Sequence, residues 1–141
     1  MAAIEVDQFL SRPPERVWQA LTDPELLARW LMPNDFRPAV GHQFTFRTEP
    51  VPEDGFDGIV HCRVLDLDPP RLLRFSWRGG RLDTEVSWRL VPEGTGTRLL
   101  ITHDGFDDTD PAQQMTMGIL GGGWRGILVK RLSAVLDAEP S

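Results

Sequence analysis

The feature that most constrains the fold is a long stretch of alternating apolar and polar residues between positions 42 and 103. Apolar side chains recur there at every second position, and short breaks rich in Gly and Pro separate the runs. This period is typical of strands that bury one face, and the short breaks favour an antiparallel meander. The predicted strands are 42–48, 57–67, 71–78, 83–91 and 95–103.

The apolar face of such a sheet needs a cover, because leaving it in water forfeits about 25 cal/mol per Å². The last segment of the chain provides the only element long enough. Asp110 supplies an N-cap oxygen and Pro111 suits a first helical position. Its core-facing stripe consists of Met117, Leu120, Trp124, Ile127, Leu128 and Val135. We therefore expect a long C-terminal helix against the sheet, with a kink at 121–123, where three Gly residues follow one another.

The segment before the meander predicts a strand and two short helices. Ile4 and Val6 alternate with acidic residues, as in a strand with one buried face. Helix start signals follow in tandem, for a helix over 13–21 and a second from Thr22 to about Pro33. The predicted fold is α+β, with a curved antiparallel sheet wrapped around the C-terminal helix. At 141 residues, the whole chain, 1–141, is expected to form a single domain.

The charge balance disfavours two classes of partner. Fifteen Lys and Arg against 21 Asp and Glu give a net charge of −6, so neither nucleic acid nor an anionic membrane surface is expected to bind. No apolar run approaches the roughly 20 residues that span a bilayer. The start of the sequence lacks a signal-peptide pattern, and the lone Cys62 cannot form an internal disulfide. These observations predict a cytoplasmic protein.

The sequence contains no motif that indicates a metal or a cofactor. There is no nucleophile elbow, no paired zinc-binding His motif and no glycine-rich phosphate loop. The acidic residues between Asp104 and Asp110 lack the spacing of a calcium loop. We expect Cys62 to pack as a small apolar residue, His61 to face outward and His42 to lie in a turn.

Large rings are concentrated on the predicted inner face of the sheet and on its covering helices. The chain has five Trp, seven Phe and no Tyr, so its rings are apolar or carry a single indole donor. They either fill a core or line a cavity, since a strongly curved sheet can enclose more volume than one helix fills. The candidate ligand-binding residues are Trp30, Phe46, Phe75, Trp77, Trp88, His103, Met117, Leu120 and Trp124.

His103 is the polar residue among these candidate ligand-binding residues. It ends the apolar alternation of the last predicted strand and should point inward. An imidazole there forms a structural or ligand hydrogen bond, or it acts as a general acid or base. The sequence offers it no obvious partner carboxylate, and whether the protein is an enzyme stays open.

Several segments together resemble a known superfamily. The first runs Pro14-Glu15-x-Val17-Trp18-x-Ala20-Leu21-Thr22-Asp23-Pro24-Glu25, followed by Trp30 and by Val40-Gly41-x-x-Phe44. The later ones are Leu67-Asp68-Pro69-Pro70-x-x-Leu73-x-Phe75-x-Trp77, Gly96-Thr97-x-Leu99-x-Ile101-x-His103-x-Gly105-Phe106 and Gly123-Trp124-x-x-x-Leu128. This pattern resembles the SRPBCC superfamily, also called START-like or helix-grip proteins, and within it the branch named after the activator of the heat-shock protein 90 ATPase.

The resemblance implies a helix-grip (START-like, Bet v-like) fold and several kinds of function. Related proteins include carriers of hydrophobic ligands, cyclases and aromatases, and co-chaperone domains, while the matching motifs are mostly structural. The main hypothesis is that a small hydrophobic or aromatic molecule binds between the sheet and the C-terminal helix. The alternatives are a cyclase or dehydratase acting on such a molecule and an interaction domain for heat-shock protein 90. A homodimer is a further hypothesis, because Gly118, Gly122 and Gly126 form a flat stripe on the last helix.

Overall fold

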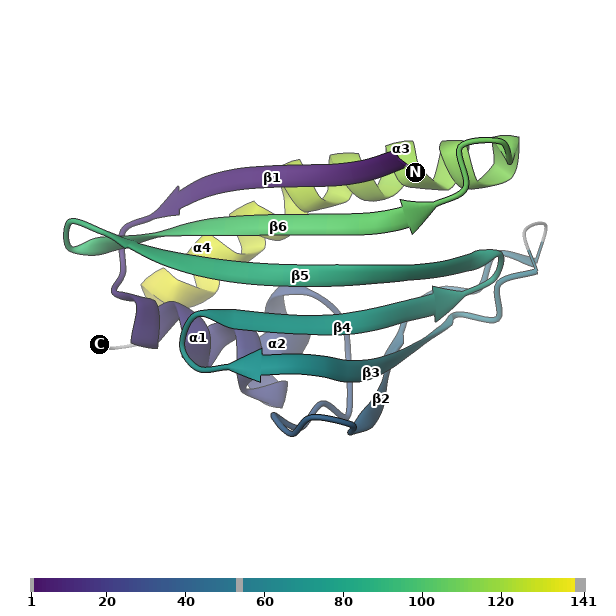
Figure 1. Cartoon of the computed structure of the whole chain (residues 1–141). Coiled ribbons are helices and arrows are strands. Elements are labelled where there is room, and N and C mark those ends of the chain that lie inside the picture. The colour runs from purple at the N-terminus through teal and green to yellow at the C-terminus, as the bar shows by residue number, and fades with distance from the viewer. Residues whose placement is uncertain (1, 53–54, 139–141) are drawn as a thin grey trace.

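Six antiparallel strands form one curved sheet in the computed structural model, which describes residues 2–52 and 55–138 (Figure 1). The strand order is β1-β6-β5-β4-β3-β2, so the first strand lies beside the last and the others follow as a meander. The strands are β1 (Ala2–Leu10), β2 (Gln43–Arg47), β3 (Ile59–Asp68), β4 (Leu72–Gly79), β5 (Leu82–Glu93) and β6 (Gly96–Phe106). The predicted meander is thus confirmed, and each of its strands ends within a few residues of the expected position.

The helices begin where the sequence signals placed them. α1 (Pro14–Thr22) and α2 (Pro24–Trp30) follow β1 in tandem. The side chain of Asp23 accepts hydrogen bonds from two backbone N–H groups in the first turn of α2. Asp110 does the same for the N–H of Ala112 at the start of α3 (Pro111–Gly122). These caps satisfy donors that a helix leaves unpaired at its first turn.

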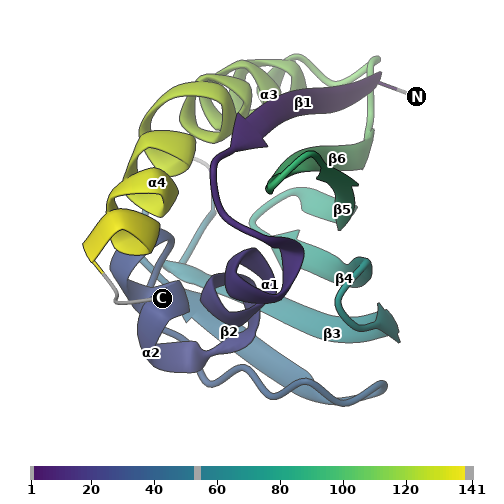
Figure 2. The same cartoon turned by 90° about the vertical axis from the view of Figure 1, so that its left-hand side faces the viewer.

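The helices lie on one face of the sheet and leave the other face bare. Viewed from the end, the C-terminal helical segments run along the concave side, and α1 and α2 close its lower end (Figure 2). The core lies between these helices and the sheet, with the inward residues of every strand buried in it. The α+β helix-grip fold predicted from the sequence is confirmed.

The C-terminal helix is not one regular helix. A π-helical segment, η2 (Gly123–Leu128), separates α3 from α4 (Val129–Ala138), close to the glycine run where a kink was predicted. A π-helical turn often marks a functional site, because it shifts the register of all the side chains that follow. Of the predicted stripe, the side chains of Ile127 and Leu128 lie outside those that the structure describes.

The two halves of this helix are packed very differently. α4 buries Val129, Leu132, Val135 and Leu136. In α3 the buried residue is Gly121, which lies against Ile4 of β1. The half formed by α3 therefore buries much less apolar surface than α4, which packs mainly against α1 and α2. None of the helices in the described ranges is both long enough and apolar enough to cross a membrane.

Candidate functional site

Most of the predicted site residues come together in one aromatic cluster. We use the name ring cluster for Trp30, Phe46, Phe75, Trp77, Trp88, His103 and Trp124. Ring centroids lie 5.0 Å apart for Phe75 and Trp88, 5.4 Å for Trp30 and Trp88, and 5.2 Å for Trp77 and His103. These spacings are those of rings in direct contact.

Strand register and helix ends explain how these rings meet. Phe75 and Trp77 alternate along β4, and Trp88 stands opposite Leu73 of β4 and Ile101 of β6. Because side chains two positions apart share a face, these rings all point to the concave side. Trp30, the last residue of α2, is fixed by an indole N–H that donates to the carbonyl of Ala20 at 2.9 Å.

Met117 and Leu120 lie at the edge of this cluster. Both project from α3, are partly buried and pack against the core. All the predicted site residues thus share one side of the sheet, and Met117 and Leu120 form its least buried part.

His103 is the polar centre of the ring cluster and is fully buried. The indole N–H of Trp124 donates to its Nδ1 at 3.2 Å, so this nitrogen acts as an acceptor. The proton of the neutral ring therefore lies on Nε2, which donates to Oγ1 of Thr84 at 2.8 Å. Thr84 in turn donates to the carbonyl of Trp77 at 2.9 Å. Both nitrogens of His103 are engaged in this directional chain.

Burial determines the charge state of His103. Desolvation lowers the pKa of its imidazole from 6.5 to about 3, so the ring is neutral across the physiological range. A proton added at Nδ1 would also face the Trp124 N–H, which is itself a donor. The geometry thus supports the structural role for His103 and disfavours acid or base chemistry by this residue.

Trp88 carries the one indole of the ring cluster whose N–H is buried without any partner among the described residues. Its side chain is 1% exposed, and the rings in contact with it belong to Trp30, Phe75 and Trp124. None of these rings carries an oxygen that can accept a hydrogen bond. A buried donor left unpaired in this way costs about 1–3 kcal/mol.

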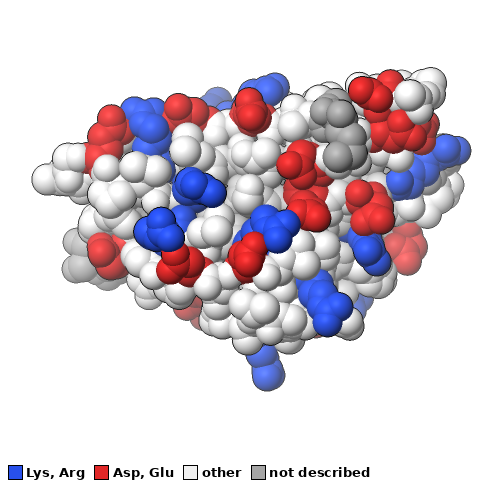
Figure 3. Space-filling model, viewed as in Figure 1, with Lys and Arg blue, Asp and Glu red and all other residues white. Residues whose placement is uncertain are grey.

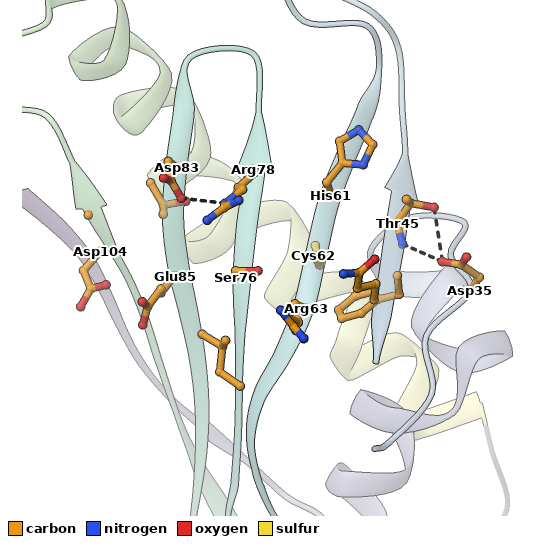
Figure 4. Close-up of a pocket in the computed structure, with 15 residues that line it drawn as sticks. Asp35, Thr45, His61, Cys62, Arg63, Ser76, Arg78, Asp83, Glu85 and Asp104 are labelled. Carbon is orange, nitrogen blue, oxygen red and sulfur yellow. Dashed lines mark hydrogen bonds and ion pairs between the residues drawn. The ribbon is translucent and has the colours of Figure 1, made fainter. Parts of the chain in front are cut away.

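A wide hollow lies on the opposite, helix-free face of the sheet. It measures about 1090 Å³ and is open to solvent. Acidic side chains of β5 and β6 line one side, and Arg63 and His61 of β3 lie toward the other (Figure 4). Its lining residues are Asp35, Gln43, Phe44, Thr45, His61, Cys62, Arg63, Leu65, Ser76, Arg78, Asp83, Thr84, Glu85, Asp104 and Gly105.

The charges on this outer face are largely paired with one another. Arg78 contacts Asp83 at 3.0 Å, and Arg74 bridges Asp66 and Glu85. Acidic and basic side chains are interspersed over the whole face (Figure 3). Exposed pairs of this kind contribute about 0–1 kcal/mol each, so they say little about stability.

Asp35 is the best-fixed carboxylate of this hollow. It accepts hydrogen bonds from the backbone N–H of Thr45 at 2.6 Å and from the Thr45 hydroxyl at 3.3 Å. These bonds, the backbone one first, hold the pKa of Asp35 below its usual value. The residue anchors the loop before β2 to that strand.

Sequence reasoning missed this hollow because outward residues of a strand are expected to form a solvated face. The usable signal is the small side chain of Ser76, which stands opposite Arg63 on β3 and Glu85 on β5. That pairing becomes visible only once the strand register is known. The cavity that the sequence predicts would lie on the other face of the sheet, between the sheet and the C-terminal helix. It stays a prediction.

The remaining titratable candidates take the expected places. Cys62 is buried and His61 is exposed. Desolvation raises the pKa of the Cys62 thiol well above its usual value, which keeps it protonated and unreactive. Within residues 2–52 and 55–138, no group of three or more His, Cys, Asp or Glu side chains is placed to hold a metal ion.

Solved structures share this architecture over nearly the whole chain. Protein MLL2253 from Mesorhizobium loti is 33% identical, with a TM-score of 0.86 over 99% of this chain and 100% of that one. CalU16 from Micromonospora echinospora is 27% identical, with a TM-score of 0.77 over 96% of this chain and 76% of that one. The Aha1 dimer from Colwellia psychrerythraea, at 20% identity and a TM-score of 0.76 over 99% and 100%, shares the fold.

A family model gives the same result at the level of sequence. The model described as "Activator of Hsp90 ATPase homolog 1-like protein" matches residues 11–137. Among curated proteins, no match to this chain was found. The resemblance derived from the sequence motifs is confirmed by a match that spans both tandem helices, the meander and the last helix. The chain therefore belongs to the Activator of Hsp90 ATPase homolog 1-like family.

Proposed function

We propose that this protein binds a small hydrophobic or aromatic molecule between the sheet and the C-terminal helix, at the ring cluster. The observation that carries the proposal is the loose packing of α3, the helix that runs along β1 and β6 on the same side of the sheet as these rings. Only Gly121 of this helix is buried, whereas α4 buries four residues. The segment of α3 that carries Met117 and Leu120 therefore separates from the sheet at the lowest cost in free energy.

The glycines at and after the end of α3 support a hinge at this place. At Gly122, Gly123 and Gly126 an added Cβ meets nothing within 4 Å, and none of the three has a positive φ. Neither crowding nor backbone conformation requires glycine there, yet each costs roughly 0.5–1 kcal/mol of helix stability relative to Ala. These residues lower the cost of bending the helix where α3 meets η2.

The family and the fold also support the binding of a hydrophobic molecule. The helix-grip resemblance implies carriers and enzymes that hold hydrophobic molecules between sheet and helix, and this chain presents aromatic rings at that position. When α3 moves outward, apolar surface between the rings and the helix becomes exposed. A hydrophobic ligand binds to that surface. We also place the protein in the cytoplasm, on the basis of its acidic composition and single buried thiol.

Two measurements test the proposal. Native mass spectrometry of the protein purified from its own host should show a bound small molecule, and a panel of lipids and polyketides should quench its Trp fluorescence. Met117→Arg places a charge in the covering wall and should abolish binding. Ala134→Arg, at an exposed position of the neighbouring helix α4, is the control and should bind normally. Equal binding by both variants contradicts a site under α3.

The enzyme alternative has less support. A cyclase or dehydratase acting on such a molecule needs an acid or a base at the ligand, and the only imidazole in the ring cluster has both nitrogens occupied. This geometry favours binding over catalysis. A reaction that runs equally well in a His103→Gln variant would show that any catalysis uses another group.

A second proposal concerns partners. We propose that the outer face of α3 pairs with a second copy of the chain. Met115 and Ile119 are 72% and 70% exposed there, and residues 111–124 contain no charged side chain. Such a patch on a surface helix is typical of an interface. The Aha1 protein from Colwellia psychrerythraea, which shares the fold, is described as a dimer.

The co-chaperone alternative rests on the name of the family. An interaction with heat-shock protein 90 stays a prediction for this chain. A pull-down from a host lysate should recover that chaperone if the prediction is correct. Recovery of no chaperone, from a preparation that retains its small-molecule binding, would remove this alternative.

A further inference from the structure

We infer that Trp88 selects the ligand of the proposed site, by donating its indole hydrogen bond to a neutral oxygen. The inference rests on the proposed function and adds the chemical class of the molecule. That class is an uncharged aromatic or otherwise hydrophobic compound that carries a hydrogen-bond acceptor, such as an aryl ketone or a quinone.

The first step is the difference between three of the four indoles of the ring cluster, those of Trp30, Trp124 and Trp88. Trp30 donates to a backbone carbonyl, and Trp124 donates to His103. The N–H of Trp88 is equally buried but has no acceptor among the residues described. Buried donors in proteins are nearly always paired, so an unpaired one in a proposed binding site indicates where an oxygen of the ligand belongs.

The second step is the position of Trp88. It lies in the middle of β5, and its ring contacts Trp30 from α2, Phe75 from β4 and Trp124 from η2. These partners come from three different elements, which a ligand separates when it enters between sheet and helices. A molecule that spreads these rings apart reaches the indole of Trp88 from the concave side.

The third step is what the site lacks. Both nitrogens of His103 and the hydroxyl of Thr84 are already used in their own chain. His103 is held neutral, and the described side chains of the ring cluster carry no charge. A ligand that brings a donor or a charge finds no matching group there, and burying either without a partner is unfavourable. A hydrogen-bond acceptor on a neutral molecule does find a partner in the ring cluster, the unpaired indole N–H of Trp88.

A matched pair of ligands tests the inference directly. 2-Acetylnaphthalene carries a carbonyl, and 2-isopropenylnaphthalene replaces that oxygen with a CH₂ group of similar shape. The native protein should bind the ketone about tenfold more tightly, which is the difference expected from one hydrogen bond to a buried donor. Trp88→Phe should bind both compounds equally. Trp30→Phe, which removes an indole whose N–H is already paired, is the control and should keep the preference.

A measurement on the native protein keeps the test independent of whether the variants fold. In a ¹⁵N-labelled sample, the indole resonance of Trp88, assigned in the native protein through its NOEs to the rings of Trp30 and Phe75, should move downfield with the ketone and not with the hydrocarbon. The indole resonance of Trp124 should stay near its free position with both compounds, because its bond to His103 persists.

The outcomes separate this inference from the proposed function. If the native protein binds both compounds with equal affinity, the selective role of Trp88 is overturned while the binding site stands. If the preference for the ketone survives in Trp88→Phe, another group donates the bond and the inference is wrong. If neither compound nor any member of the lipid and polyketide panel binds, the proposed function fails and the inference fails with it.

Discussion

The indole N–H of Trp124 donates a hydrogen bond to Nδ1 of His103 across 3.2 Å and thereby ties η2 to the last strand, β6. Because Nδ1 accepts this bond, the proton of His103 lies on Nε2, which donates to the hydroxyl oxygen of Thr84. The contact is polar but lies inside an aromatic interior. It is the point at which the helix is fixed to the sheet, just beyond the weakly packed α3.

The buried His103 should make stability depend on pH. Its pKa is about 3 in the folded state and 6.5 in the unfolded state, so below pH 6.5 the unfolded chain binds a proton that the folded chain does not. Its contribution is fully present above about pH 6.5 and is lost as the pH falls toward 3. Between pH 7.5 and pH 5, the free energy of unfolding should drop by about 2 kcal/mol. Urea denaturation across this range measures the drop.

The exposed His61 provides the control for that experiment. His61→Gln should reproduce the profile of the native protein, because this imidazole faces solvent. His103→Gln should be less stable at pH 7.5 but nearly flat down to pH 5. A steep profile in His103→Gln would assign the pH dependence to other groups.

Thr84→Val should destabilise the protein although it keeps the shape of the side chain. The change removes the hydroxyl that accepts from His103 and donates to the carbonyl of Trp77. Because the N–H of His103 stays buried without an acceptor, the loss should be about 1–3 kcal/mol in chemical denaturation. Thr102→Val, at a half-buried position of β6 on the outer face, should change stability by no more than about 0.5 kcal/mol.

Replacing hinge glycines by Ala should stabilise the helix and slow the entry of ligands. Gly122 and Gly123 have helical φ values of −63° and −62° and open space at Cβ. Each Ala should add roughly 0.5–1 kcal/mol to the free energy of unfolding. Stopped-flow fluorescence should show slower association of a bound probe with the double variant.

A glycine elsewhere in the chain gives the opposite expectation. Gly105 has a φ of +97°, and a Cβ there lies 3.3 Å from the Cα of Thr84. Gly105→Ala should destabilise the protein by about 1 kcal/mol or more. If all three positions respond alike, the open space at Gly122 and Gly123 is not what distinguishes them.

The outer face of α3 makes the oligomeric state testable. Gly122→Glu introduces a charge beside the exposed Met115 and Ile119, and it should lower the mass measured by light scattering. Lys130→Glu changes the charge at an exposed position of α4 and should leave the mass unchanged. A native protein that scatters as a monomer at high concentration contradicts the proposed pairing.

Cys62 should react with thiol reagents only after unfolding. Its thiol is buried, and desolvation raises its pKa, so little thiolate forms at neutral pH. A disulfide reagent should label it slowly in native buffer and at once in concentrated urea. Rapid labelling of the native protein would show that β3 opens locally.

The fold was predictable from the sequence because its signals are local and agree with one another. Alternation marks the strands, Asp23 and Asp110 mark helix starts, and breaks at Pro and Gly separate the elements. What escaped prediction depends on tertiary packing. The π-helical segment that carries Trp124 and the hydrogen bond from Trp124 to His103 are not encoded in any periodicity of the sequence.

The site was predictable only in part, because the rest of it depends on tertiary packing. The rings were correctly assigned to one face, since a strand fixes the direction of every second side chain. Which N–H lacks a partner depends on where the neighbouring oxygens lie, so the difference between Trp30 and Trp88 appears only in the structure. The hollow around Ser76 likewise depends on the register between strands.

The strand order has a consequence for the way the chain is made. β1 pairs with β6, so Leu10 lies opposite Thr97 and Ala3 opposite Asp104. During synthesis from the N-terminus, the first strand emerges long before its partner, whereas β3 to β6 pair with strands next to them in the sequence. Ile4, Val6 and Leu10 have no neighbouring strand until β6 has left the ribosome, so the sheet is closed by the strand that was synthesised first.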